Sequence, residues 1–364
     1  HISLWQAMSK YLSQLGKFSD AINASKKLVQ IAPDNHNNYV TLAIEQANAG
    51  KFEEAINSYN DALKLESRNA NTHLLLGHAL KTIGMRKDCE KAYEQSVSLD
   101  KVNGTAYWAL ADLKSYRFNE QQIKEMNAIF NDNSISKEQA CQAGFALAKH
   151  YEDEKQTELA FQYYQKANNL RPNVHFSNKE YSKICKELKT AFDQQGIKNQ
   201  ASILENAATP IFIVGLTRSG STLIEQILAS HSQIEGTMEL YSLPRVVRLA
   251  EKLCRSRKLN YPSQVTQLTQ EELTYLGKQY LDETTIFREG KQYFIDKLPP
   301  NFHSVGLIHK ILPNAIIIDA RRHPLSTGFS NYKQHFANGY DFSYKLDNIG
   351  HYYNTYLEIM DHRD

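Results

Sequence analysis

The fold of the second half of the chain is decided by three adjoining segments: Pro210-Ile-Phe-Ile-Val-Gly215, Leu216-Thr-Arg-Ser-Gly220-Ser-Thr222 and Leu223-Ile-Glu-Gln-Ile-Leu228. The first is a short apolar run typical of a buried strand, and the third has the apolar periodicity of a helix. A strand, a glycine-bearing loop and a helix in this order present backbone N–H groups and a helix start to an anion. The stretch therefore predicts an α/β domain with a phosphate-binding loop.

The loop carries several groups that suit an anion. Its glycines allow a tight turn and a close approach of the backbone to phosphate, while its hydroxyls and one cation add donors. The residues expected to bind are Gly215, Arg218, Ser219, Gly220, Ser221 and Thr222. The glycine spacing is that of a P-loop, but Ser221 stands where a nucleoside triphosphatase has lysine. A P-loop kinase or NTPase therefore remains an alternative, although a disfavoured one.

A second motif follows another apolar strand, Ala315-Ile-Ile-Ile-Asp319, of the kind expected in a parallel sheet buried on both faces. Arg322 lies at the end of this strand, and Ser330 follows eight residues later with Pro324 between them. An arginine fork binds phosphate through charge-assisted hydrogen bonds, and Ser330 would donate from the first turns of the next helix. The alternative is a surface arginine and a helix-capping serine.

The two motifs, in this order and about 100 residues apart, resemble those of sulfotransferases. The loop is similar to the 5′-phosphosulfate loop of that family, with Thr217 and Ser221 in place of the commoner proline and threonine. In the family, the arginine and the serine of the second motif hold the 3′-phosphate of the donor. The resemblance thus implies that 3′-phosphoadenosine 5′-phosphosulfate (PAPS) is the co-substrate, bound partly by Arg322 and Ser330.

The resemblance also implies which residues are catalytic. Sulfuryl transfer needs a group that takes the acceptor proton and cations that stabilise charge on the bridging oxygen. The catalytic part is similar to tyrosylprotein sulfotransferases, whose catalytic glutamate follows a second short strand, at the position of Glu239 here. The family lysine that contacts the bridging oxygen corresponds to Lys297, which precedes Leu298-Pro299. Arg218 would be the second cation, and the resemblance implies no metal.

Each of these assignments has an alternative. Glu235 is a rival to Glu239 as base, and Glu239 itself could be a glutamate at a helix N-terminus. Lys297 could be a surface lysine paired with Asp296. His231 is nearby, and some relatives use a histidine base, but a helix-end position suits it better. Asn301 could orient the substrate or cap the next helix.

The first half of the chain contains an internal repeat with a period of 34 residues, marked by Gly16, Gly50 and Gly84. Small or aromatic residues recur in register within the units: Ala21, Ala55 and Cys89; Ala43, Gly77 and Ala111; Tyr59 and Tyr93. A weaker unit places Ala148, Ala160, Tyr164, Ala167 and Pro172 in the same register. This pattern resembles the tetratricopeptide repeat (TPR), in which small residues let two antiparallel helices approach and stacking of units buries the apolar faces.

These observations predict an α-helical TPR solenoid at residues 1–172, a helical connector at 173–208 and an α/β P-loop-like sulfotransferase domain with a parallel sheet at 209–364. The concave face of the solenoid is expected to bind a protein or peptide partner, or else only to position the second domain. The chain begins with His1 and ends inside a helical pattern, so we expect a fragment whose catalytic domain is truncated at its C-terminus.

The composition limits the functions that are possible. The formal net charge of +2 gives no general attraction to nucleic acid or membranes, and no apolar run reaches the length of a spanning helix. The four separated cysteines are interpreted as free thiols in a reducing compartment, which favours a cytoplasmic location. We therefore expect a PAPS-dependent sulfotransferase acting on a hydroxyl of protein tyrosine, a sugar or a metabolite. A non-catalytic TPR interaction protein is a further alternative.

Overall fold

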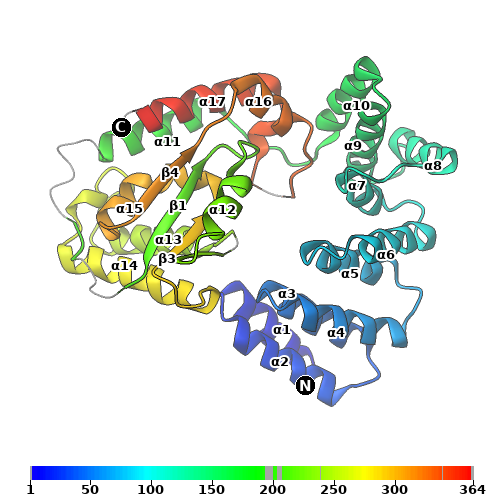
Figure 1. Ribbon diagram of the computed structural model, residues 1–364, viewed down its shortest axis with the longest axis horizontal. Coiled ribbons are helices and arrows are strands. Elements are labelled where there is room, and N and C mark those ends of the chain that lie inside the picture. The colour runs from blue at the N-terminus through cyan, green and yellow to red at the C-terminus, as the bar shows by residue number, and fades with distance from the viewer. Residues whose placement is uncertain (1, 193–199, 203–206, 238, 338, 362–364) are drawn as a thin grey trace. The chain divides into compact units, whose positions relative to one another are not determined.

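The computed structural model of the protein describes residues 2–192, 200–202, 207–237, 239–337 and 339–361. The chain divides into two compact units, His1–Asn173 and Val174–Asp364. Figure 1 shows helices throughout the first unit and a small sheet flanked by helices in the second. The predicted order of a helical solenoid followed by an α/β domain is confirmed.

The first unit consists of helices joined by short turns. Their bounds are α1 (Ile2–Gln14), α2 (Phe18–Ile31), α3 (His36–Asn48), α4 (Phe52–Leu65), α5 (Ala70–Thr82), α6 (Arg86–Leu99), α7 (Gly104–Asp112), α8 (Glu120–Asn131), α9 (Lys137–Asp153) and α10 (Thr157–Leu170). The glycines at the 34-residue period, Gly16, Gly50 and Gly84, lie in the turns between paired helices with φ of 75°, 76° and 78°. Left-handed backbone of this kind favours glycine, so the repeated glycine fixes each turn.

The recurring small residues lie where the helices pack. Ala21, Ala55 and Cys89 are fully buried at equivalent positions of three successive second helices. A Cβ at Gly77 would lie 2.4 Å from the Tyr93 ring, so the close approach of α5 and α6 requires glycine there. The repeat signal in the sequence is therefore a packing signal.

The second unit contains a four-stranded, fully parallel sheet in the order β2-β3-β1-β4. The strands are β1 (Thr209–Gly215), β2 (Ile234–Gly236), β3 (Tyr293–Lys297) and β4 (Ile316–Ala320). Its α-helices are α11 (Asn178–Ala191), α12 (Ser221–Ala229), α13 (Ser242–Ser256), α14 (Gln270–Thr284), α15 (Val305–Ile311), α16 (Pro324–Tyr332) and α17 (Leu346–Asp361). Helix α11, in the segment expected to be a connector, packs against α17 within this unit.

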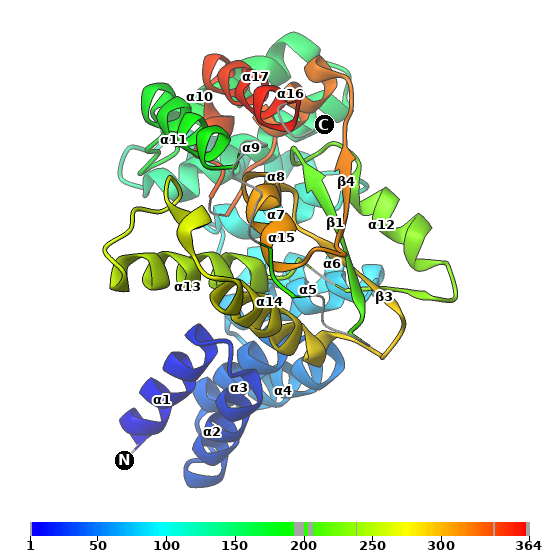
Figure 2. The same ribbon diagram turned by 90° about the vertical axis from the view of Figure 1, so that its left-hand side faces the viewer.

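Alternation along the strands sends side chains to two different layers. Ile211, Ile213 and Ile295 pack with residues of α12 on one face, whereas the Phe212 and Phe294 rings contact that of Tyr280 on α14. Figures 1 and 2 show α12 and α14 on opposite sides of the sheet. Because successive side chains of a strand point to opposite faces, the last two residues of β3 must also diverge.

Two further expectations concern the whole chain. All four cysteines lie in the described part of the chain, where they are buried and form no disulfide bond. Among the residues that the structure describes, no helix combines the length and the apolar character that crossing a bilayer requires.

Candidate active site

The phosphate loop connects β1 to α12 through residues with left-handed backbone. Arg218 has φ of 67° and Gly220 has φ of 98°, and α12 begins directly after Gly220. A positive φ is strained for arginine, and such strain is concentrated at functional sites. The loop thus combines left-handed backbone at two residues with the start of a helix. Loops of this kind direct backbone N–H groups toward a bound anion.

Two predicted loop residues lie outside the cavity described below. A Cβ at Gly215 would lie 2.7 Å from the carbonyl oxygen of Ala320, so the close approach of β1 and β4 requires glycine there. The Ser219 hydroxyl is buried and has no hydrogen-bond partner. Neither residue lines the cavity described below.

The two motifs meet although more than 100 residues separate them. Arg218 Nε donates to Ser330 Oγ at 3.2 Å. Thr217 Oγ1 donates to Asn331 Oδ1 at 2.5 Å, and Asn331 Nδ2 donates to the Thr217 carbonyl at 2.9 Å. These bonds tie the phosphate loop to α16, so both motifs belong to one site.

A cavity of about 400 Å³ lies where this loop meets the ends of the strands. Its lining contains Thr217, Arg218, Gly220, Ser221, Thr222, Glu239, Lys297, Pro299, Arg322, Ser330, Phe336 and Tyr340. Lys297 ends β3 and Arg322 follows β4, so the cavity occupies the carboxyl edge of the sheet. Open parallel sheets bind their ligands at this edge.

Lys297 is the central cation of the cavity. Only 8% of the residue is exposed, and its Nζ donates to Glu239 Oε1 at 2.7 Å. A second carboxylate, that of Glu225 on α12, lies 4.0 Å from the same nitrogen. The expected alternative, a surface lysine paired with Asp296, does not describe this residue.

Asp296 points to the opposite face, as strand alternation requires. Tyr280 Oη donates to its Oδ2 at 2.8 Å, and Asn301 Nδ2 lies 3.5 Å from its Oδ1. Burial is the main cause that raises the pKa of Asp296 to about 7, and the charges of Glu225 and Glu239 act in the same direction. Asn301 therefore supports a buried carboxyl group and is absent from the cavity lining.

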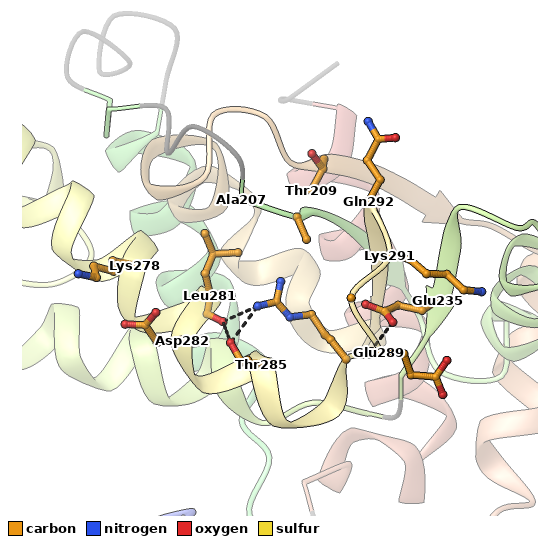
Figure 3. A pocket seen from close by; sticks show the side chains of 13 residues that line it. Ala207, Thr209, Glu235, Lys278, Leu281, Asp282, Thr285, Glu289, Lys291 and Gln292 are labelled. Carbon is orange, nitrogen blue, oxygen red and sulfur yellow. Dashed lines mark hydrogen bonds between the residues drawn. The ribbon is translucent and has the colours of Figure 1, made fainter.

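The rival base Glu235 lies elsewhere. It lines a separate cavity of about 920 Å³, and its carboxylate accepts from the Glu289 backbone N–H at 2.5 Å. Figure 3 shows this second cavity, with Thr209 and Gln292 beside the starts of β1 and β3. His231 follows α12, and its Nδ1 accepts from the Gln233 N–H at 3.2 Å, as a helix-end residue does. Glu239, unlike Glu235, faces the phosphate loop.

Several residues in the cavity lining or beside it were not expected from the sequence. The Phe336 and Tyr340 rings lie 4.4 Å apart at its border, and burial raises the pKa of Tyr340 to about 12. The signal available in the sequence was the aromatic cluster after α16. For Glu225 the signal was a single acidic residue within an otherwise apolar helical pattern.

Metal ligands were not expected at this site. Within the described ranges, no three His, Cys, Asp or Glu side chains are grouped so that they could hold a metal ion.

Comparison with known proteins assigns both halves of the chain. Residues 210–364 match the model of the sulfotransferase family, and residues 2–35, 47–84, 70–103 and 145–174 match tetratricopeptide repeat models. An uncharacterized protein of Aquifex aeolicus (strain VF5) is 30% identical over 268 residues, which are 72% of this chain. The chain spans 35% of the length of that relative.

Two solved structures each match a little under half of the chain at low identity. MamA from Desulfovibrio magneticus RS-1 is 18% identical, with a TM-score of 0.36, and the match covers 46% of this chain and 94% of MamA. YrrB, a TPR protein with an unusual peptide-binding site, is 16% identical with a TM-score of 0.35, covering 46% of this chain and 86% of YrrB. From the two family matches, the chain combines tetratricopeptide repeats with a domain of the sulfotransferase family.

Proposed function

We propose that the second unit is a sulfotransferase that moves the sulfuryl group of PAPS to an acceptor hydroxyl. The observation that carries the proposal is the single cavity at the carboxyl edge, where both phosphate motifs meet the Lys297–Glu239 pair. A doubly phosphorylated nucleotide suits this arrangement, because the cavity offers cations from two separate elements.

The donor would be held at both of its anionic ends. The loop amides, Arg218, Ser221 and Thr222 face the position proposed for the 5′-phosphosulfate, and α12 adds the positive end of its dipole. Arg322 and Ser330 would take the 3′-phosphate. The Arg218–Ser330 hydrogen bond supports this division, since it keeps the two phosphate subsites adjacent.

In the proposed reaction, the acceptor oxygen forms a bond to sulfur while the bond from sulfur to the bridging oxygen breaks. The acceptor proton passes to the Glu239 carboxylate, and adenosine 3′,5′-bisphosphate leaves with the bridging electron pair. The Lys297 ammonium stabilises the charge on that oxygen, as oriented cations do in related group transfers. In the structure, Lys297 donates a hydrogen bond of 2.7 Å to Glu239. In the proposed reaction this hydrogen bond must break, so that Lys297 can contact the bridging oxygen of the donor and Glu239 can contact the acceptor hydroxyl.

Nucleotide binding separates this proposal from a P-loop kinase or NTPase. Calorimetric titration should show tight binding of adenosine 3′,5′-bisphosphate and weak binding of ATP, because the loop has Ser221 where a triphosphatase has its lysine. Preference for ATP would overturn the assignment.

Transfer separates it from a non-catalytic interaction protein. A ³⁵S-labelled donor should transfer label to phenol, sugar or lysate acceptors, and Glu239→Gln should abolish the transfer while it retains nucleotide binding. A wild-type protein that binds nucleotide but labels no acceptor would favour the non-catalytic reading.

We propose that the repeat array binds a protein or peptide partner, as stacked repeats with extended surfaces commonly do. The four cysteines are buried and form no disulfide bond in the described structure, which supports a reducing compartment such as the cytoplasm. Pull-down by residues 1–173 fused to a tag, compared with the whole chain, would test the partner.

A further inference from the structure

A third carboxylate, that of Glu225, lies beside the catalytic pair. Helix α12 exposes Leu223 and Ile227 by 66% and 62%, yet Glu225 on the same helix is only 4% exposed. Burying a carboxylate while two large aliphatic side chains remain in solvent is unfavourable unless the charge is compensated. The inward position of Glu225 therefore needs a partner.

Lys297 supplies the compensating charge. The carboxylate and the ammonium are 4.0 Å apart, and the two side chains are exposed by only 6% and 9%. The carboxylate of Glu239 also contacts this ammonium, but the Glu239 side chain is 48% exposed. Lys297 thus has one fixed, buried counter-charge and one that can reach solvent.

We propose that Glu225 is a positioning residue that keeps the Lys297 ammonium protonated and directed at the bridging oxygen while Glu239 takes the acceptor proton. This inference rests on the proposed sulfuryl transfer. When the proton moves from the acceptor to Glu239, that carboxylate loses its charge and no longer stabilises the ammonium. Glu225 retains its charge through the step, and Glu239 afterwards releases the proton through its exposed side.

The surroundings of Glu225 are consistent with this role. Helix α12 packs against β1, β2 and β3, and the charged groups near Glu225 are Lys297, Glu239 and, on the far face of β3, Asp296. Burial raises the pKa of Glu225, the Lys297 charge lowers it and the Glu239 charge raises it again. Burial is the largest of these causes, so the pKa of Glu225 lies above its usual value, and the ion pair with Lys297 is the contact that opposes this rise.

The direct test measures the Lys297 amine and does not depend on turnover. Trace acetylation with acetic anhydride at several pH values, followed by peptide mass spectrometry, reports how readily Lys297 loses its proton. Glu225→Gln should raise the labelling of Lys297 at pH 8 about tenfold, because an opposite charge at this distance strongly favours the protonated amine. Glu235→Gln is the matched control, since Glu235 is equally buried at 4% but lines the other cavity.

Turnover gives the second readout. Glu225→Gln should lower kcat about 10- to 100-fold with KM for the donor little changed, and should move the alkaline limb of the pH–rate profile to lower pH. Glu225→Asp should restore part of the rate, whereas a merely structural defect would lower the rate at all pH values alike.

The two proposals fail in different ways. Equal Lys297 labelling in wild type and Glu225→Gln would overturn the role of Glu225, even if the wild type transfers sulfuryl groups. Absence of transfer by the wild type would overturn the proposed function, while the labelling would still decide whether Glu225 controls Lys297.

Discussion

The two ends of the parallel strands carry cavities with similar side chains and different organisation. At the amino edge, Glu235, Arg288 and Lys291 bond backbone groups near them: the Glu289 N–H, the Leu281 carbonyl and the Ile234 carbonyl. At the carboxyl edge, Arg218 and Lys297 instead bond side chains, those of Ser330 and Glu239.

This difference separates the cavity of the proposed active site from the other cavity. The amino-edge cavity is larger, about 920 Å³ against about 400 Å³, yet its charged groups bond main-chain groups, as Figure 3 shows for Glu235 and the Glu289 N–H. The carboxyl-edge cations instead bond side chains that line the same cavity. Strand polarity, rather than volume or charge content, therefore distinguishes the two.

The largest expected effect comes from removing the proposed base at the carboxyl edge. Glu239→Gln should lower kcat for sulfuryl transfer by about 10²- to 10⁴-fold, because the amide cannot take the acceptor proton. Steady-state assays with labelled donor would measure it. A rate within tenfold of that of the wild type would show that Glu239 is not the base.

A smaller effect is expected from the link between the motifs. Arg218→Lys keeps the charge but loses the Nε donor to Ser330, and should weaken binding of adenosine 3′,5′-bisphosphate about 10- to 100-fold. Calorimetry measures the affinity. Unchanged affinity would show that the charge alone of Arg218 matters and that the two motifs need no direct bond.

A third prediction concerns stability. The pKa of Asp296 rises from 3.8 to about 7 on folding, so the folded state holds this proton more tightly. The resulting stabilisation is complete below about pH 4 and is lost as pH rises through 7. Between pH 4.5 and 8, the wild type should therefore lose about 1 to 4 kcal/mol of unfolding free energy relative to Asp296→Asn. Urea denaturation at both pH values tests this, and parallel losses in the two proteins would contradict it.

The smallest effect is expected at the amino edge. Glu235→Gln should leave transfer and nucleotide affinity within about twofold of wild type, since surface or remote changes rarely alter a distant site. The same assays apply, and a large loss of transfer would make the second cavity part of the active site.

Much of the fold could be predicted because its signals are local. The 34-residue repeat marks turns that need Gly16, Gly50 and Gly84, and the run at 210–215 marks a buried strand. Arg322 was expected after a strand end, and it follows β4; Lys297 ends β3, so both lie at the carboxyl edge, since parallel strands share their polarity.

The parts that could not be predicted depend on contacts between distant segments. The packing requirement for Gly215 could not be predicted, because it arises where β4 passes close to β1. Glu225 gave no motif, because its importance arises from its distance to Lys297 across the α12–β3 interface. The sequence shows Phe336 and Tyr340 only as aromatic residues after α16. Their place in the cavity lining depends on the path of the chain after that helix.

We propose that the phosphate loop and the segment around Arg322 hold the two phosphates of one nucleotide. Titration of the wild type and Arg322→Ala with adenosine 3′,5′-bisphosphate and with adenosine 5′-monophosphate tests this claim. The wild type should prefer the bisphosphate by about 100-fold, and Arg322→Ala should lose most of that preference while its affinity for the monophosphate stays the same. Equal binding of both nucleotides by the wild type, or an unchanged preference in the variant, would contradict the claim.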